Sequence, residues 1–384
     1  CAASRASILT GLVERTHGYT FGQGDIQEAY VAQSYPVKLR DAGYTTGFFG
    51  KFGINYPEFA KLFDVGEEYD RNNLFRDRRG YFFKKIKEDT VHLSRYTGQQ
   101  AIDFIANTPA EKPFVLSLSF SAPHAHDGAE LQYFWSSAYD TLYQNLVVPD
   151  PLLSEDKYFQ TLPEYIRTGE NRTRWNWRFD TPEKYQRSVK GYFRMISEVD
   201  AEIGKIRKAL EAKGLAENTV IILMGDNGYF LGERQLAGKW LMYDNSLRVP
   251  LILYDPRQIG GERNTDFALN IDIPSTILDL AGVAAPKSWQ GTSLRSKELS
   301  ERKDFLSEHL WQVDIIAPSE AIRTESWKYL RYINDPQQEE LYDLALDPLE
   351  SNNLAADPLH QEILKELRIK MEQKIASYLK AKIQ

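Results

Sequence analysis

The sequence predicts an α/β fold in which helices cover a mixed, mostly parallel sheet, followed by a smaller subdomain with an antiparallel sheet. Three observations support this prediction. Apolar strand-like runs alternate with helix-like segments over residues 1–295, and one long segment carries apolar residues at helical spacing. After residue 295 the chain changes to short aromatic pieces with alternating polarity. The order helix–strand–helix–strand is typical of α/β domains.

The first strands are short and follow helix-stop signals. Residues 35–42 read as a helix closed by Gly43, and residues 44–49 read as a strand. Residues 114–120 form another apolar strand candidate, which leads directly into Ser-Ala-Pro-His. Between residues 136 and 180 the periodicity is weak, which indicates a long, partly irregular insertion near a ligand.

A long helix is expected to begin at Pro182, because Thr181 can cap the free backbone N–H groups and proline suits the first helical position. Gly214 should end it. Its apolar positions are Val189, Tyr192, Phe193, Ile196, Val199, Ile203, Ile206 and Leu210.

The next strand candidate, residues 220–224, is apolar throughout, which favours a place in the middle of a parallel sheet. The elements expected after it are a strand at 249–253, a helix at 274–280, strands at 321–324, 327–332 and 340–344, and a final helix at 358–379. We therefore expect a catalytic α/β domain over 1–295 and a C-terminal subdomain over 296–384.

Composition excludes some classes of function. The net charge of −7 gives no support to nucleic-acid binding, and no apolar run is long enough to span a membrane. Cys1 is the one cysteine, so no disulfide can form within this sequence. A basic cluster is either a solvated face or an anion contact; it comprises Arg76, Arg78, Arg79, Lys84, Lys85 and Lys87. The sequence opens without Met or a signal peptide, so we expect a fragment whose targeting information lies outside it.

Polar side chains follow several predicted strands at the point where each strand ends. Lys51 follows the first, His124 another, and Asp226 and Asn227 the fully apolar one. Because ligands of open α/β sheets bind beyond the carboxyl ends of the strands, we expect these segments to converge on one crevice, together with Cys1.

The opening segment Cys1-Ala-Ala-Ser-Arg5-Ala-Ser-Ile-Leu-Thr10-Gly11 resembles the signature of the formylglycine-dependent sulfatases. The resemblance implies that a maturation enzyme oxidises Cys1 to formylglycine, an aldehyde whose hydrate can accept a sulfuryl group and then release sulfate. It also implies that Arg5 braces the hydrate or the attached anion. The segment after Cys1 looks helical, so free N–H groups at a helix N-terminus would face the sulfate. Taken alone, a free cysteine would be interpreted as a small buried hydrophobe.

A second segment, residues 224–250, resembles the family's Asp-His/Asn-Gly, Leu-Gly-Glu, lysine and Ser-x-Arg-Val-Pro pattern. The resemblance implies that Asp226 and Asn227 ligate calcium and that Lys239 contacts the sulfate. Carboxylate and amide oxygens are the ligands that Ca²⁺ prefers; Mg²⁺ is the less favoured alternative. By itself, Asp-Asn-Gly is more often a turn.

Two further segments resemble the family with some departures. Lys51 lies in Gly-Lys-Phe-Gly-Ile-Asn, similar to the family's Gly-Lys segment, whose lysine touches formylglycine and sulfate. Gly53 stands where many members have histidine, which puts that histidine's role in doubt here. His124, in Ser-Ala-Pro-His, is similar to the histidine that protonates the leaving alcohol, a role suited to its near-neutral pKa. His126 is the alternative, and His17 fits a structural position.

The resemblance runs to about residue 355 and implies an alkaline-phosphatase-like α/β/α sandwich. It also implies two further acidic metal ligands, upstream of Cys1 and so outside this sequence. The expected substrate is a sulfated carbohydrate, and the expected location is periplasmic or secreted. Trp135, Trp175 and Trp177 either stack on sugar rings or pack in the core. Two alternatives stay open: a phosphonate or phosphate ester hydrolase of the same superfamily, and a non-catalytic binder of sulfated glycans, which Gly53 would favour.

Overall fold

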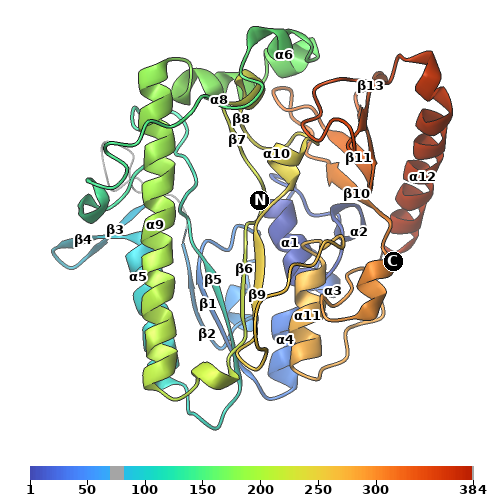
Figure 1. Ribbon diagram of the computed structural model, residues 1–384. Coiled ribbons are helices and arrows are strands. Elements are labelled where there is room, and N and C mark those ends of the chain that lie inside the picture. The colour runs from blue at the N-terminus through green and yellow to red at the C-terminus, as the bar shows by residue number, and fades with distance from the viewer. Residues whose placement is uncertain (70–81, 383–384) are drawn as a thin grey trace.

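The structure is a computed structural model that describes residues 1–69 and 82–382. Its central parallel sheet has the strand order β2-β1-β5, formed by Val65–Glu68, Thr45–Gly50 and Phe114–Ser119 (Figure 1). β1 lies in register with β5, so that Gly50 pairs with Ser119 at the carboxyl ends of both strands. The part of the basic cluster formed by Arg76, Arg78 and Arg79 lies outside the described residues, while Lys84 forms an ion pair with Glu67.

Helices cover both faces of this sheet (Figure 1). α5 (Leu93–Asn107) and α9 (Pro182–Ala212) form one layer, and α1 (Ala2–Thr10), α4 (Tyr35–Asp41) and α11 (Asp272–Leu280) form the other. Alternate residues of β5 serve the two layers, because successive side chains of a strand point to opposite faces. Leu116 and Leu118 pack against α5 and α9, whereas Val115 packs with the α1 and α4 layer. The predicted α/β/α arrangement is therefore confirmed.

Local signals in the sequence explain where these helices begin and end. The hydroxyl of Thr181 accepts the backbone N–H of Lys184 at 3.2 Å, and Pro182 is the first residue of α9. α4 ends before Gly43, which adopts a φ of +91°, and α1 ends at Gly11 with a φ of +68°. Glycine is favoured in this left-handed region because it has no Cβ.

The predicted central position of the strand at 220–224 is wrong. β6 (Ile221–Met224) pairs antiparallel with β9 (Leu251–Tyr254), and within the described residues β9 is its one strand partner. Leu223, Ile252 and Tyr254 are 41%, 55% and 45% exposed. An apolar run reports that a strand is suited to burial on both faces, but it does not specify the direction or number of its neighbours.

The C-terminal part is an antiparallel sheet in the order β10-β11-β12-β13, formed by Asp304–His309, Ser319–Thr324, Trp327–Tyr332 and Asp335–Asp343. One face packs on α12 (Gln361–Lys380). The other face shares a core with residues 159–166 and 230–247. The predicted antiparallel subdomain is confirmed, while its boundary at residue 295 stays a prediction, since the core is continuous across it.

Shorter elements fill the insertion and the edges. The insertion at 136–180 contains α6 (Asp156–Gln160), α7 (Glu164–Arg167) and α8 (Glu170–Arg178). The remaining short elements are α2 (Glu14–His17), α3 (Glu28–Val31), α10 (Asp244–Leu247), β3 (Phe83–Ile86), β4 (Asp89–His92), β7 (Phe230–Leu231) and β8 (Ala237–Gly238). In the described part of the chain, none of the helices has the length and apolarity needed to cross a bilayer.

Candidate active site

The predicted site residues lie at the carboxyl edge of the strands and at the start of α1. Cys1 is the N-cap of α1, and its carbonyl accepts the backbone N–H of Arg5 at 2.8 Å. The Nζ of Lys239, a residue that is 6% exposed, lies 3.7 Å from the Sγ of Cys1. Two residues 238 positions apart in the sequence therefore meet, and the side chain of Cys1 has both a helix N-terminus and a cation beside it.

Arg5 joins three segments of the site. Its Nε donates to the Oδ2 of Asp226 at 3.0 Å, and its Nη1 donates to the carbonyl of Lys51 and to the hydroxyl of Ser119. Burial would raise the pKa of the Asp226 carboxyl, but the surrounding positive charges, that of Arg5 first among them, outweigh it and hold the pKa well below its usual range. Asp226 is therefore an anion at all physiological pH values.

Lys51 is held in place at the end of β1. It is 8% exposed, and its backbone N–H donates to the Ser119 carbonyl at 2.9 Å. Gly53 has a φ of +68°, and a Cβ at that position would lie 3.4 Å from Cδ of Arg5 and 3.5 Å from Cε of Lys51. The position that departs from the family pattern therefore faces the predicted site directly.

The two candidate histidines have different environments. His124 follows β5 after a cis Ala122–Pro123 bond, is half-buried, and its Nδ1 faces the Ala125 carbonyl. His126 is 4% exposed and packs against the ring of Phe134 at 6.3 Å between centroids. The more accessible ring, that of His124, is the better candidate for contact with a substrate.

Asp226 and Asn227 have the chemistry of a cation site. The Nδ2 of Asn227 donates to the Gly228 carbonyl at 2.7 Å, whereas its Oδ1 is buried and has no hydrogen-bond partner among the described residues. An unpaired buried amide oxygen beside a permanent carboxylate fits a hard divalent cation. Within residues 1–69 and 82–382, no group of three or more His, Cys, Asp and Glu residues is arranged to hold a metal ion.

His17 contacts α1 through Ser7. Its Nε2 lies 3.1 Å from the Ser7 hydroxyl, and its Nδ1 accepts the backbone N–H of Tyr19 at 3.0 Å. Burial lowers the pKa of His17 to about 3, so the ring is neutral. These two contacts hold the ring between α1 and the segment that follows α2.

Two of the three tryptophans, Trp135 and Trp175, each pack against an arginine. The guanidinium of Arg194 lies 4.6 Å from the centre of the Trp135 ring, and that of Arg172 lies 4.0 Å from the centre of the Trp175 ring. These contacts favour core packing over sugar stacking for both rings. Trp177 is partly buried on α8.

Sequence reasoning missed two groups of site residues. Ser119 ends β5 and accepts Arg5, but a serine in an apolar strand gives no distinctive signal. Asp127, three residues after His124, accepts Arg174 at 2.6 Å and also Arg178. The sequence did carry a signal for Asp127. This aspartate lies close to a candidate catalytic histidine, and the insertion that follows contains arginines that could pair with it.

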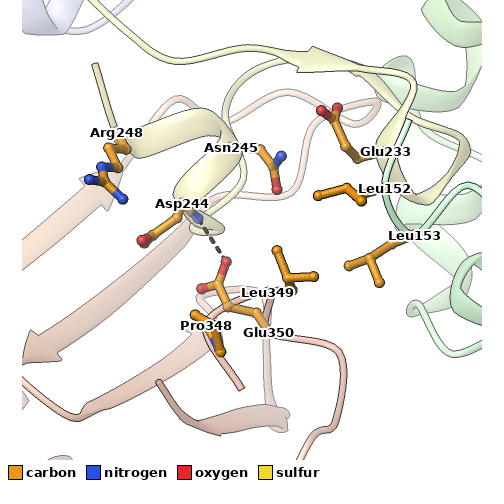
Figure 2. Close-up of a pocket in the computed structure, with 9 residues that line it drawn as sticks. All are labelled: Leu152, Leu153, Glu233, Asp244, Asn245, Arg248, Pro348, Leu349 and Glu350. Carbon is orange, nitrogen blue, oxygen red and sulfur yellow. Dashed lines mark hydrogen bonds between the residues drawn. The ribbon is translucent and has the colours of Figure 1, made fainter. Parts of the chain in front are cut away.

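A cavity of about 260 Å³ lies at the junction of the α/β part and the C-terminal sheet (Figure 2). It contains none of the seven predicted site residues. It is lined by Leu152, Leu153, Glu233, Asp244, Asn245, Arg248, Pro348, Leu349 and Glu350. The backbone N–H of Asp244 donates to Glu350 at 2.8 Å across it. The cavity therefore belongs to the interface between the two parts and not to the predicted site.

The α/β/α sandwich with this edge of polar residues has the alkaline-phosphatase-like fold, which the chain shares with solved structures. A solved complex of a protein with its substrate D-glucosamine-2-N,6-O-disulfate superposes with a TM-score of 0.82 at 23% identity, covering 98% of this chain and 88% of that one. A phosphonate monoester hydrolase from Silicibacter pomeroyi gives a TM-score of 0.77 at 21% identity, covering 98% and 86%. These likenesses establish the fold.

The chain belongs to the sulfatase family, whose family model matches residues 1–283, and it is a sulfuric ester hydrolase. A second family model, described as N-sulphoglucosamine sulphohydrolase, C-terminal, matches residues 232–377. The chain is 25% identical to an N-acetylglucosamine-6-O-sulfatase of Bacteroides thetaiotaomicron, over 98% of this chain and 77% of that protein. It is 29% identical to a choline-sulfatase of Rhizobium meliloti, over 93% and 73%.

Proposed function

We propose that the protein removes sulfate from a sulfated carbohydrate, with a formylglycine derived from Cys1 as the nucleophile. The observation that carries the proposal is the distance of 3.7 Å between the Sγ of Cys1 and the Nζ of Lys239. The hydrogen bond from Arg5 to Asp226 lies in the same site. Several relatives are named for action on sulfated sugars, including the N-acetylglucosamine-6-O-sulfatase and a delta 4,5-hexuronate-2-O-sulfatase of Bacteroides thetaiotaomicron. They support a carbohydrate substrate for this chain as well.

The hydrated aldehyde at position 1 would supply the attacking oxygen and, by reverting to the aldehyde, a route for sulfate to leave. The ammonium groups of Lys51 and Lys239 would neutralise charge on the sulfuryl oxygens, which is the largest contribution in many transfers of anionic groups. As the bond from sulfur to the sugar oxygen breaks, His124 would donate a proton to that oxygen. Arg5 would hold Asp226 and Lys51 in place relative to residue 1 through its hydrogen bonds to both.

Asp226 and Asn227 would hold a divalent cation, and we propose calcium, because both supply hard oxygen ligands. The cation would stabilise negative charge on the sulfuryl group. Removing it with a chelator should abolish turnover of an aryl sulfate, and added Ca²⁺ should restore more activity than Mg²⁺. Full activity in metal-free buffer would contradict this assignment.

Maturation and location complete the proposal. Conversion of a cysteine to formylglycine requires a maturation enzyme as a partner. We place the mature protein in the periplasm or outside the cell, because sulfated glycans are extracellular. Expression with and without a formylglycine-generating enzyme, followed by mass spectrometry of the Cys1 peptide, tests the first point. Fractionation of the native host tests the second.

The decisive experiment replaces Cys1. In the full-length enzyme produced with a maturation enzyme, Cys1→Ala should lower kcat on an aryl sulfate by at least about 10⁴-fold, as loss of a nucleophile does elsewhere. Asn176→Ala, at an exposed position on α8, is the control. Unchanged turnover by Cys1→Ala would reject the proposal.

A second function is supported by the fold likeness to a phosphonate monoester hydrolase. Aryl sulfate and aryl phosphonate assayed side by side distinguish the two, since the preferred ester has the larger kcat/KM. The remaining interpretation, non-catalytic binding of sulfated glycans, is not proposed, because the chain belongs to the sulfatase family and is an enzyme.

A further inference from the structure

We propose that α8, a helix of the insertion at 136–180, positions the catalytic segments through Asn171, Arg174 and Arg178. This inference rests on the proposed sulfatase chemistry and adds positioning residues to it. The three side chains recur at positions i, i+3 and i+7, so they share one face of the helix. That face contacts the segments that carry Lys239, His124 and the Asp226–Asn227 pair.

Asn171 fixes the segment that carries Lys239. Its Nδ2 donates to the carbonyls of Ala237 at 3.0 Å and of Lys239 at 2.9 Å, and Asn171 is 4% exposed. The backbone here is unusual, because Gly238 has a φ of +100° and Trp240 a φ of +84°. A bulky residue with positive φ persists only where its surroundings hold it. One amide therefore bridges two carbonyls of a strained turn, and that turn directs Lys239 to Cys1.

Arg174 contacts both Lys239's neighbour and the segment after His124. Its guanidinium lies 4.4 Å from the centre of the Trp240 ring, and its Nη2 donates to the Oδ2 of Asp127 at 2.6 Å. Its Nε donates to Glu170, one turn earlier on α8, at 2.8 Å. The planar guanidinium can stack and form directed hydrogen bonds at the same time, which a lysine cannot do.

Arg178 completes the connection. It is fully buried and donates to Asp127, to the Gln132 side chain at 2.9 Å and to the Tyr229 hydroxyl at 2.7 Å. Asp127 and Gln132 flank the loop that follows His124, and Tyr229 follows the Asp226–Asn227 pair by two residues. A fully buried guanidinium with this many partners fixes the loops it joins, since an unpaired buried charge is costly.

Geometry at a reacting centre explains why such contacts matter. A displacement of about 1 Å that a mutation away from the chemistry causes can lower the rate about 100-fold. For residues that bind metals, loss of a supporting contact costs about 10- to 100-fold, and we expect a similar scale here. If α8 positions Lys239 through Asn171 and His124 through Arg174, its variants should lower kcat more than they raise KM. If α8 has a purely structural role, its variants should lower the free energy of unfolding and leave kcat unchanged.

The first test requires no catalysis. Cys1 is the one cysteine of this sequence, and in protein produced without a maturation enzyme mass spectrometry of the Cys1 peptide follows its alkylation by iodoacetamide. A neighbouring lysine favours the reactive thiolate. Asn171→Ala should therefore slow alkylation at about pH 7.5 by about threefold or more, whereas Asn176→Ala, the same change at an exposed position of α8, should match wild type. Equal rates for both variants would overturn the proposal.

The second test uses matured enzyme and aryl sulfates whose phenols span a range of pKa values. Asn171→Ala should lower kcat by about tenfold or more across the whole series, because Lys239 stabilises the sulfuryl group. Arg174→Lys should lower kcat about tenfold for the most acidic phenol and about 100-fold for the least acidic, because His124 protonates the leaving oxygen. KM should stay within about threefold for both variants.

The outcomes separate the two hypotheses. If wild type turns over no sulfate ester, the proposed function fails, and the alkylation rates still decide whether α8 positions Lys239. If wild type is active and both variants keep its kcat while their melting temperatures fall, α8 is only structural and the positioning proposal is rejected. A loss by Arg174→Lys that is uniform over the phenol series would reject the link from Arg174 to His124.

Discussion

At the scale of single residues, the site depends on close approaches of backbone and side chain. Arg5 contacts Asp226, the Lys51 carbonyl and Ser119, so its guanidinium is already occupied by the protein. This differs from the role that the sequence suggested, which was a direct brace for the hydrate or for the attached anion. The arrangement makes Arg5 a support for the ends of β1, β5 and β6, and direct contact with substrate stays a prediction.

Gly50 is the residue that permits the approach of β1 to β5 just before Lys51. It has a φ of +116°, and a Cβ would lie 2.1 Å from the Ser119 carbonyl oxygen. Gly50→Ala should therefore force the strand ends apart, lower the free energy of unfolding by about 2–4 kcal/mol and reduce kcat. Urea unfolding and aryl sulfate turnover measure both effects.

Gly204→Ala is the matched control for this substitution. Gly204 lies inside α9, and a Cβ added there would have no atom of the described neighbouring segments within 4 Å. Alanine should therefore raise stability by about 0.5–1 kcal/mol at this position. A Gly50→Ala variant as stable as the Gly204→Ala variant would show that the strand ends can separate without cost.

Glu14 should make stability depend on pH. Burial, and to a lesser extent the charge of Glu308, raise the pKa of Glu14 from 4.5 to about 7. The folded state then binds the proton more tightly than the unfolded state, so this contribution is full below pH 4.5 and is lost as the pH rises through about 7. Glu14→Gln should match wild type at about pH 4.5 and be about 3 kcal/mol more stable at about pH 8.5. Urea unfolding at the two pH values measures the difference.

Glu111→Gln, at an exposed position, is the comparison for Glu14 and should change stability equally at both pH values. A Glu14→Gln variant whose stability difference from wild type is the same at the acidic and the alkaline pH would show that Glu14 ionises normally in the folded protein.

At the scale of elements, the sequence predicted helix capping and periodicity, but it did not predict contacts between distant segments. The cap at Thr181, the stop at Gly43 and the terminal helix depend on local chemistry, and the structure has all three. The antiparallel partner of β6 depends on β9, a strand much later in the chain. Strand direction is decided by packing over the whole sheet, which local patterns do not report.

The same division holds for the site. The motifs brought out Cys1, Arg5, Asp226 and Lys239, and the structure places these residues in contact with one another or with a common partner. Asn171 carries no motif, because its role depends on the distance from α8 to the Lys239 carbonyl. Positioning residues are defined by three-dimensional contacts, so a single sequence does not mark them.

The N-terminus of α9 gives a prediction at this scale. Thr181 accepts the backbone N–H of Lys184 at 3.2 Å, one of the free donors of the first turn. Thr181→Ala should lower the free energy of unfolding by about 1 kcal/mol, while Thr181→Ser should keep most of it, because serine caps as well as threonine. Urea unfolding measures both. If the serine variant is destabilised as much as the alanine variant, the hydroxyl contributes nothing and packing of the methyl group explains the loss.

At the scale of the whole molecule, the α/β part and the C-terminal sheet share a core and a buried ion cluster. Lys328 of β12 is fully buried and donates to Asp244 of α10 and to Glu350. The Glu350 carboxylate also accepts the backbone N–H of Asp244 beside the cavity at the junction (Figure 2). The family model for the sulfatase C-terminal region spans this junction, since it begins at residue 232.

Removing the cation from this cluster should therefore separate the two parts. Lys328→Met leaves the buried Glu350 carboxylate and the partly exposed Asp244 carboxylate without the ammonium group that they share, which should cost about 3–5 kcal/mol near about pH 8. Burial raises the pKa of Glu350 although Lys328 opposes this, so without Lys328 the Glu350 carboxyl should take up a proton more readily, and the loss at about pH 5 should be smaller than at about pH 8. Urea unfolding at both pH values, with Lys303→Met on the exposed Lys303–Glu325 pair as the control, measures the difference.

Adding Glu350→Gln to Lys328→Met should recover part of the loss at the higher pH, because it removes one of the two unpaired charges. A loss that is the same at both pH values and is not reduced in the double variant would mean that Lys328 stabilises the junction by packing and not by charge.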